Sequence, residues 1–212
     1  AGTVVSVDIL VDGVVAVPSS TLGTVSTTLT LTEGQHTITL RAIDSAGNVG
    51  TAQAVVRLDT LAPIIALNPA PELTNGTIFT VSGSVLDNGS GIAAANVYVN
   101  GALAASPLPS ADGGVVADVR LDEGLNTIEL RATDLTGNAA GSQVVTTLDT
   151  MPPNVQVLSV PAITSNASLL VLGSVDDANG IESASYLVNG VDLGALTPDD
   201  DGMVSASVEL PE

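Results

Sequence analysis

Apolar and polar residues alternate with a period of two along much of this chain, which is the pattern of β-strands with one buried face. The clearest examples are the segments 37–44 and 127–134. Their inward positions are Ile38, Leu40 and Ala42 in the first segment and Ile128, Leu130 and Ala132 in the second. Segments 78–86, 95–99, 115–121 and 143–148 show the same alternation or a short apolar run, and we expect strands there as well.

Turn residues separate these segments. Asn100-Gly101 and Asn189-Gly190 each stand between two apolar runs, which is the strongest short signal for a β-hairpin. Glycines and prolines divide the remainder at intervals of roughly 8–12 residues, as in a β-sandwich. Helical periodicity and helix caps do not coincide over any ten residues, so the pattern predicts an all-β fold.

The chain is an internal repeat with a period of about 90 residues. Segments 33–63 and 123–153 align without a gap, and 16 of their 31 positions are identical. Each segment ends on Leu-Asp-Thr-x-x-Pro, which places boundaries at Pro63 and Pro153. We therefore predict three tandem immunoglobulin-like (fibronectin-III-like) β-sandwiches: a partial repeat at 1–63 without its opening strands, a complete repeat at 64–153, and a partial repeat at 154–212 without its closing strands.

The complete repeat is expected to close as a sandwich around aliphatic side chains, because the 212 residues include one Phe, two Tyr and no Trp. Its predicted interior comprises Val81, Val119, Ile128, Leu130 and Ala132. Large aromatic side chains would bury about 150–250 Å² each. A core without them gives modest stability, so a repeat of this kind gains from its neighbours or from bound ions.

Charge excludes several classes of function. The chain has 23 acidic residues against four Arg and no Lys, a formal net charge of −19. Such a surface repels phosphate backbones and anionic lipids, so we predict no nucleic-acid partner. No apolar run reaches the roughly 18 residues of a membrane span. The absence of Cys excludes a disulfide scaffold and a thiolate metal site.

The few basic residues are interpreted structurally. His36 aligns with Asn126, so the repeat does not require a histidine there, and we expect it to be exposed at the start of a strand. Arg41 and Arg131 occupy equivalent outward positions, where a carboxylate on the neighbouring strand is the expected partner.

The repeated motifs resemble the bacterial immunoglobulin-like repeats of large surface adhesins and envelope proteins; they are GSV, VNG, DG, EG, NTI, LRATD and GN, closing with LDT-x-x-P. They are also similar to the accessory sandwich module of glucodextranase. The resemblance covers the whole chain and implies a prokaryotic protein that is secreted or attached to the cell surface. It further implies that calcium stiffens the string of domains, through linker acids and loop acids.

Three groups of residues are candidates for such a site, because calcium takes six to eight oxygen ligands from carboxylates, amides and carbonyls. They are the Asp-x-x-Gly-Asn loops, the linker acids, and the acids that follow the second strand of a repeat. The candidate ligands are Asp44, Asn48, Asp134 and Asn138 in the loops, Asp59 and Asp149 in the linkers, and Asp87, Asp176 and Asp177 after the second strand. The alternative, that these residues only shape turns, remains open because Asp and Asn commonly accept backbone hydrogen bonds in turns.

No constellation of residues supports catalysis, so we predict neither an enzyme nor catalytic or cofactor-binding residues. The sequence favours a structural segment of an extracellular stalk or fibre, whose partners are neighbouring immunoglobulin-like domains of the same or adjacent chains. A surface receptor would then bind elsewhere on the parent chain. Two alternatives remain: a filament subunit whose sandwiches pack or exchange strands, and an accessory array of a secreted glycosidase.

Overall fold

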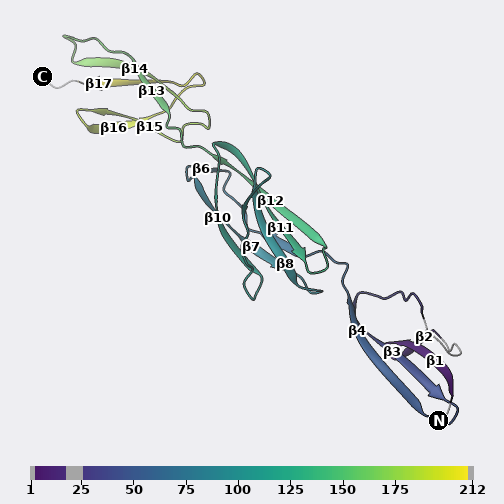
Figure 1. Ribbon diagram of the computed structural model, residues 1–212. Coiled ribbons are helices and arrows are strands. Elements are labelled where there is room, and N and C mark those ends of the chain that lie inside the picture. Colours follow the sequence, from purple (N-terminus) through teal and green to yellow (C-terminus); the bar gives the residue numbers. More distant parts are fainter. Residues whose placement is uncertain (1–2, 18–25, 210–212) are drawn as a thin grey trace. The chain divides into compact units, whose positions relative to one another are not determined.

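The computed structural model describes residues 3–17 and 26–209, and every regular element in that part of the chain is a β-strand (Figure 1). The fold class is all-β, as the sequence predicts. The chain separates into two compact units, Ala1–Leu148 and Asp149–Glu212. The described residues include no helix of the length and apolarity that a membrane crossing needs. The division into three repeats at 63 and 153 stays a prediction.

The first repeat contributes one antiparallel sheet in the order β2-β1-β3-β4. Its strands are β1 (Val4–Val11), β2 (Val14–Val17), β3 (Gly34–Asp44) and β4 (Val49–Leu58). No second sheet covers this one among the described residues of the repeat. The expected inward side chains of β3 are therefore incompletely buried, and Leu40 is 44% exposed.

The middle repeat forms two sheets that pack face to face. One has the order β10-β7-β5 and the other the order β6-β12-β11-β8-β9. The first consists of β5 (Ile64–Leu67), β7 (Ile78–Leu86) and β10 (Gly114–Arg120). The second consists of β6 (Leu73–Thr74), β8 (Ile92–Val99), β9 (Ala102–Ala105), β11 (Gly124–Asp134) and β12 (Ala139–Leu148).

The core of the middle repeat confirms the period-two prediction. Along β11 every second residue from Asn126 to Asp134 is buried. Ile128 and Leu130 are fully enclosed, and the other predicted interior positions, Val81, Val119 and Ala132, are buried as well. The remaining buried apolar residues are Val85, Ala95, Val97, Val99, Val115, Leu121 and Leu148. Phe79 only packs against this cluster, so aliphatic side chains fill the core, as the composition indicates.

The Asn-Gly hairpins also form as predicted. Asn100 and Gly101 both have positive φ, 51° and 82°, and connect β8 to β9. Two consecutive positive φ values are the requirement of a type I′ turn, which matches the twist of the paired strands. Asp12-Gly13 and Asn189-Gly190 adopt the same conformation, so the three repeats share this turn.

The second unit contains a three-stranded sheet in the order β13-β14-β17 and the hairpin β15-β16. The strands are β13 (Asn154–Ser159), β14 (Ser168–Asp176), β15 (Ala184–Val188), β16 (Val191–Leu196) and β17 (Met203–Glu209). Val175, Val204, Ala206 and Val208 are its buried apolar residues. A cavity of about 240 Å³ lies between sheet and hairpin, with Val157, Tyr186 and Leu196 in its lining.

Two expectations about the basic residues are corrected. His36 is buried, with 7% of its surface exposed, because the strand alternation places it on the same face of β3 as Ile38. Arg131 pairs with Glu129 of its own strand, at 2.7 Å, and its guanidinium lies over the Tyr98 ring. Arg41 does pair across strands as predicted, since its guanidinium donates to Asp8 of β1.

Candidate functional site: an acidic cluster

Three carboxylates from separate segments meet in the unit Ala1–Leu148. Asp59 follows β4, Asp87 follows β7, and Asp134 is the last residue of β11. Each offers an oxygen atom, and these atoms all lie within 4.8 Å of one another. Asp134 is 2% exposed and Asp59 is 6% exposed, while Asp87 is half-buried. We call these three residues the acidic cluster.

Asp134 is held in place by the loop that it begins. Its Oδ1 accepts hydrogen bonds from the backbone N–H groups of Thr136, Gly137 and Asn138, at 2.7–2.9 Å. The side-chain amide of Asn138 donates to Oδ2 at 2.7 Å. Burial works against ionisation, but these donors outweigh it and hold the pKa of Asp134 below its ordinary value. The carboxylate therefore remains charged at neutral pH.

Asp59 is anchored by Leu61 and Ser90. The N–H of Ser90 donates to Oδ2 at 2.6 Å, and the N–H of Leu61 donates to Oδ1 at 3.2 Å. The Ser90 hydroxyl has the largest effect on Asp59 and lowers its pKa, and the N–H of Ser90 lowers it further. Burial and the charge of Asp134 act in the opposite direction but are outweighed. Ser90 Oγ is itself buried and is a further oxygen atom beside the Asp59 carboxylate.

The loop after β11 also binds the segment that follows β4. Thr136 Oγ1 donates to the backbone oxygen of Asp59 at 3.1 Å. The amide nitrogen of Asn138 lies 3.2 Å from that oxygen and 3.2 Å from the oxygen of Leu61. The linker residues 59–61 are thus hydrogen bonded to a loop some 77 residues further along the chain.

The cluster has no positive counterpart in the part of the chain that the structure describes. None of the three carboxylates is within salt-bridge distance of Arg or His, and the sequence contains no Lys. The nearby Arg57 donates instead to the backbone oxygen of Asn88, at 2.7 Å. Three like charges this close repel one another unless a cation or a proton joins them. An all-oxygen donor set of this kind suits a hard cation such as calcium.

The other predicted site residues do not gather into such a group among the described residues. Asp44 and Asn48 bond only within their own loop, where Asp44 accepts from the N–H groups of Ala46 and Asn48. Asp149 accepts from Asn179, which in turn donates its N–H to Asp177. Asp176 ends β14 opposite Asn154. At these positions the structure shows hydrogen bonds within turns and at strand ends, and one bond that joins the linker residue Asp149 to Asn179, 30 residues further along.

Sequence reasoning did not single out Gly89 and Ser90, although both adjoin the cluster. A Cβ atom on Gly89 would lie 2.3 Å from the carboxyl carbon of Asp59, so only glycine leaves room for this carboxylate. The third repeat has Asn179-Gly180 in this region. The Gly-Ser pair therefore does not recur between repeats, and comparing the repeats could not point to either residue.

Substituting Gly89 therefore tests the geometry of the cluster. We expect Gly89→Ala to push the Asp59 carboxylate off its Ser90 and Leu61 donors and to lower the melting temperature of the chain by several degrees. Gly76→Ala is the matched control, because the nearest atoms to its new Cβ would lie at 3.6 Å, an ordinary contact. Equal melting temperatures for the two variants in circular dichroism would contradict this close fit.

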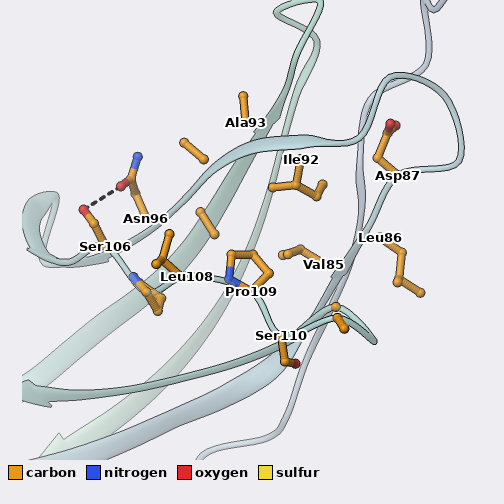
Figure 2. Close-up of a pocket in the computed structure, with 15 residues that line it drawn as sticks. Val85, Leu86, Asp87, Ile92, Ala93, Asn96, Ser106, Leu108, Pro109 and Ser110 are labelled. Atoms are coloured by element: carbon orange, nitrogen blue, oxygen red, sulfur yellow. Dashed lines mark hydrogen bonds between the residues drawn. The ribbon is translucent and has the colours of Figure 1, made fainter.

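A groove of about 520 Å³ lies beside Asp87 in the middle repeat. Figure 2 shows Val85, Ile92, Leu108 and Pro109 along its floor and rim, with Ser106 donating to Asn96 at 2.7 Å. Asp87 is the one charged residue in its lining. Any acid–base chemistry in the groove would therefore rest on this one carboxylate.

No protein-family model and no curated protein sequence matches the chain. Several solved structures are similar in fold. Fibronectin(III)-like modules of Clostridium thermocellum CbhA match at 16% identity and a TM-score of 0.39, over 69% of this chain and 79% of theirs. A tetra-tandem repeat from the extending region of a large adhesion protein matches at 20% identity and a TM-score of 0.43, over 99% of this chain and 59% of that one.

A third similar structure is a Ca²⁺-stabilised adhesin that helps an Antarctic bacterium to bind ice. It matches at 18% identity and a TM-score of 0.39, over 99% of this chain and 57% of that one. These neighbours are the fibronectin-III-like modules and tandem adhesin repeats that the sequence resembles. At this level of identity the likeness concerns the fold alone.

Proposed function

We propose that this chain is a structural, non-catalytic segment of a tandem immunoglobulin-like array, in which calcium at the acidic cluster fixes the linker after β4 to the middle sandwich. The observation that carries the proposal is the meeting of Asp59, Asp87 and Asp134 within 4.8 Å, two of them buried and none paired with a base. Each comes from a different segment, so an ion held by all three would join those segments.

The donor set supports calcium over softer metals. The three carboxylates supply hard oxygen ligands, and Ser90 Oγ is a further buried oxygen beside the Asp59 carboxylate. The hydrogen bonds that keep Asp59 and Asp134 ionised also orient them before any ion arrives. When bound, the ion supplies positive charge that relieves the repulsion among the three carboxylates.

The proposed setting is the outside of a prokaryotic cell, where free calcium is available to weak sites. The repeated Leu-Asp-Thr-x-x-Pro segment supports a role in spacing, since it recurs between predicted sandwiches as a linker would. The partners in this proposal are the adjoining immunoglobulin-like domains of the array.

Calcium binding is tested by thermal unfolding of the full chain in calcium, in magnesium and in chelator. At a calcium concentration about 100 times the dissociation constant, linkage predicts a rise in melting temperature of roughly 5–10 °C. Asp59→Asn and Asp134→Asn should each abolish most of that rise. Asp44→Asn is the matched control, because Asp44 is the repeat equivalent of Asp134 but bonds only within its own loop.

The outcome that contradicts the proposal is a melting curve that is the same in calcium and in chelator, together with no heat of calcium binding in titration calorimetry. A rise that persists in Asp59→Asn and Asp134→Asn would also contradict it, because the ion would then bind elsewhere.

A further inference from the structure

The corner where β3 begins in the first repeat contains a buried histidine with two close partners. His36 Nδ1 lies 2.7 Å from Oδ2 of Asp12, which occupies the turn between β1 and β2. Its Nε2 lies 2.8 Å from the backbone oxygen of Thr32. The other carboxylate oxygen of Asp12 accepts the N–H of Thr37 at 2.8 Å, so this acid joins the turn to β3 twice.

Both partners of the ring are acceptors. A carboxylate and a carbonyl cannot donate, and a neutral imidazole has only one N–H. In the neutral form one ring nitrogen would therefore direct its lone pair at an oxygen lone pair. The nearest hydroxyl, Thr32 Oγ1, is 3.5 Å from Nε2, at the limit of a hydrogen bond. The imidazolium, which donates from both nitrogens, satisfies the corner completely.

The middle repeat has an equivalent corner in which two asparagines stand in place of the histidine and its acid, and the Asp122 carboxylate lies 3.4 Å from Asn100 Nδ2. Asn126 replaces His36 and Asn100 replaces Asp12. Asn126 is fully buried and accepts from Asn100 Nδ2 at 3.1 Å and from the N–H of Asp122 at 3.0 Å. The turn is attached to the strand in the same way, since Asn100 Oδ1 accepts the N–H of Thr127 at 2.9 Å. The two repeats thus differ in charge but not in connectivity.

We propose that His36 and Asp12 form a pH-sensitive lock in the first repeat, which holds the β1–β2 turn on β3 in mildly acidic solution and weakens as the pH rises, while the Asn126–Asn100 corner of the middle repeat does not respond. The two asparagines carry no titratable proton, so their corner serves as an internal control for the pH dependence of the His36–Asp12 pair.

The direction of the effect follows from the protonation of each partner. The Asp12 carboxylate and then the Thr32 carbonyl raise the pKa of His36 above 6.5, against the effect of burial. The stabilisation is therefore complete below pH 6.5 and is lost as the pH rises through the raised value. The Thr37 N–H and then His36 lower the pKa of Asp12 below 3.8, so its contribution is present above pH 3.8 and is lost as the pH falls through the lowered value.

Other charged groups do not account for this behaviour. Glu33, the nearest acid in sequence, accepts from the N–H and the hydroxyl of Thr60. On β4 the residue opposite His36 is Val56. The one charged side chain of β1, Asp8, is paired with Arg41. Among the described residues, Asp12 is the titratable side chain that is hydrogen bonded to the ring.

The full chain offers a direct test, because His36 is its only histidine. Proton NMR should show one imidazole that titrates above pH 6.5. Hydrogen exchange, corrected for intrinsic rates, should show the opening constant at the Thr37 amide rising about three- to tenfold between pH 6 and pH 8.5. The Thr127 amide, its equivalent in the middle repeat, should show a constant value.

The double variant His36→Asn with Asp12→Asn copies the corner of the middle repeat and should remove the pH dependence at Thr37. Asp12→Asn alone should lower the pKa of His36. An imidazole in the wild-type chain that titrates at or below pH 6.5 overturns the proposal, as does an equal pH dependence at Thr37 and Thr127. The imidazole titration and the comparison of the two amides are both measured on the wild-type chain, so they test the proposal even if a variant fails to fold.

Discussion

Replacing Leu130 by Ala should destabilise the middle sandwich by about 2–5 kcal/mol, whereas Leu40→Ala in the first repeat should cost less than about 1 kcal/mol. The two leucines are equivalent in the repeat, 90 residues apart in the same Leu-Arg-Ala sequence. Leu130 is fully buried between two sheets, while Leu40 is 44% exposed. Truncating Leu130 loses its buried apolar surface and leaves a cavity in the core, which adds to the cost.

Urea unfolding followed by far-UV circular dichroism, with hydrogen exchange to separate the repeats, gives both values. The protection lost in Leu130→Ala should be confined to the strands of residues 64–148. Similar losses for the two variants would mean that the faces of β3 and β11 are buried to the same extent, contrary to the structure.

Asn126→Ala should cost roughly 1–3 kcal/mol, the second largest effect we expect from a single substitution. Asn126 is fully buried and its amide donates to the backbone oxygens of Asp122 and Gly124, at 2.7 and 2.8 Å. Its oxygen accepts from Asn100 and from the N–H of Asp122. Alanine would remove all four of these hydrogen bonds from a fully buried position, so the backbone groups of Asp122 and Gly124 and the Asn100 amide would lose this partner.

Asn96→Ala in the same sheet is the matched control. Asn96 accepts one hydrogen bond from Ser106 on the exposed face, so its loss should change the free energy of unfolding by less than about 1 kcal/mol. Equal unfolding free energies for Asn126→Ala and Asn96→Ala would show that the buried amide contributes little.

The strands and their faces were predictable because alternation is a local property. The period of two placed Ile128, Leu130 and Ala132 inside, and the Asn-Gly pairs located the hairpins, without any knowledge of which strands pair. The same rule places His36 on the inward face of β3. We expected it to be exposed because it stands at the start of a strand and the repeat has Asn126 in its place. Its partner Asp12 lies 24 residues away, so nothing local showed that a buried histidine would have a hydrogen-bond partner.

The acidic cluster was only partly predictable for the same reason. All three acids were candidates, but so were six other residues with similar local sequence. What distinguishes Asp59, Asp87 and Asp134 is the path of the chain after β4, which brings the linker against two loops of the middle repeat. Ser90 and Gly89 contribute through position, as a buried hydroxyl and as a missing side chain, and neither property is visible in a sequence.

The different corners of the two repeats have a consequence for folding. Repeats that share 16 of 31 positions over this segment risk pairing a strand of one with the strands of the other. If β11 took the place of β3 and Asn126 kept its bonds to Asp122 and Gly124, the oxygen of Asn126 would face the carboxylate of Asp12, two acceptors without a proton between them. The correct partner, Asn100, presents a donor at that point. The Asp12 corner therefore favours its own strand β3 over β11, as a buried polar residue fixes the register of a coiled coil.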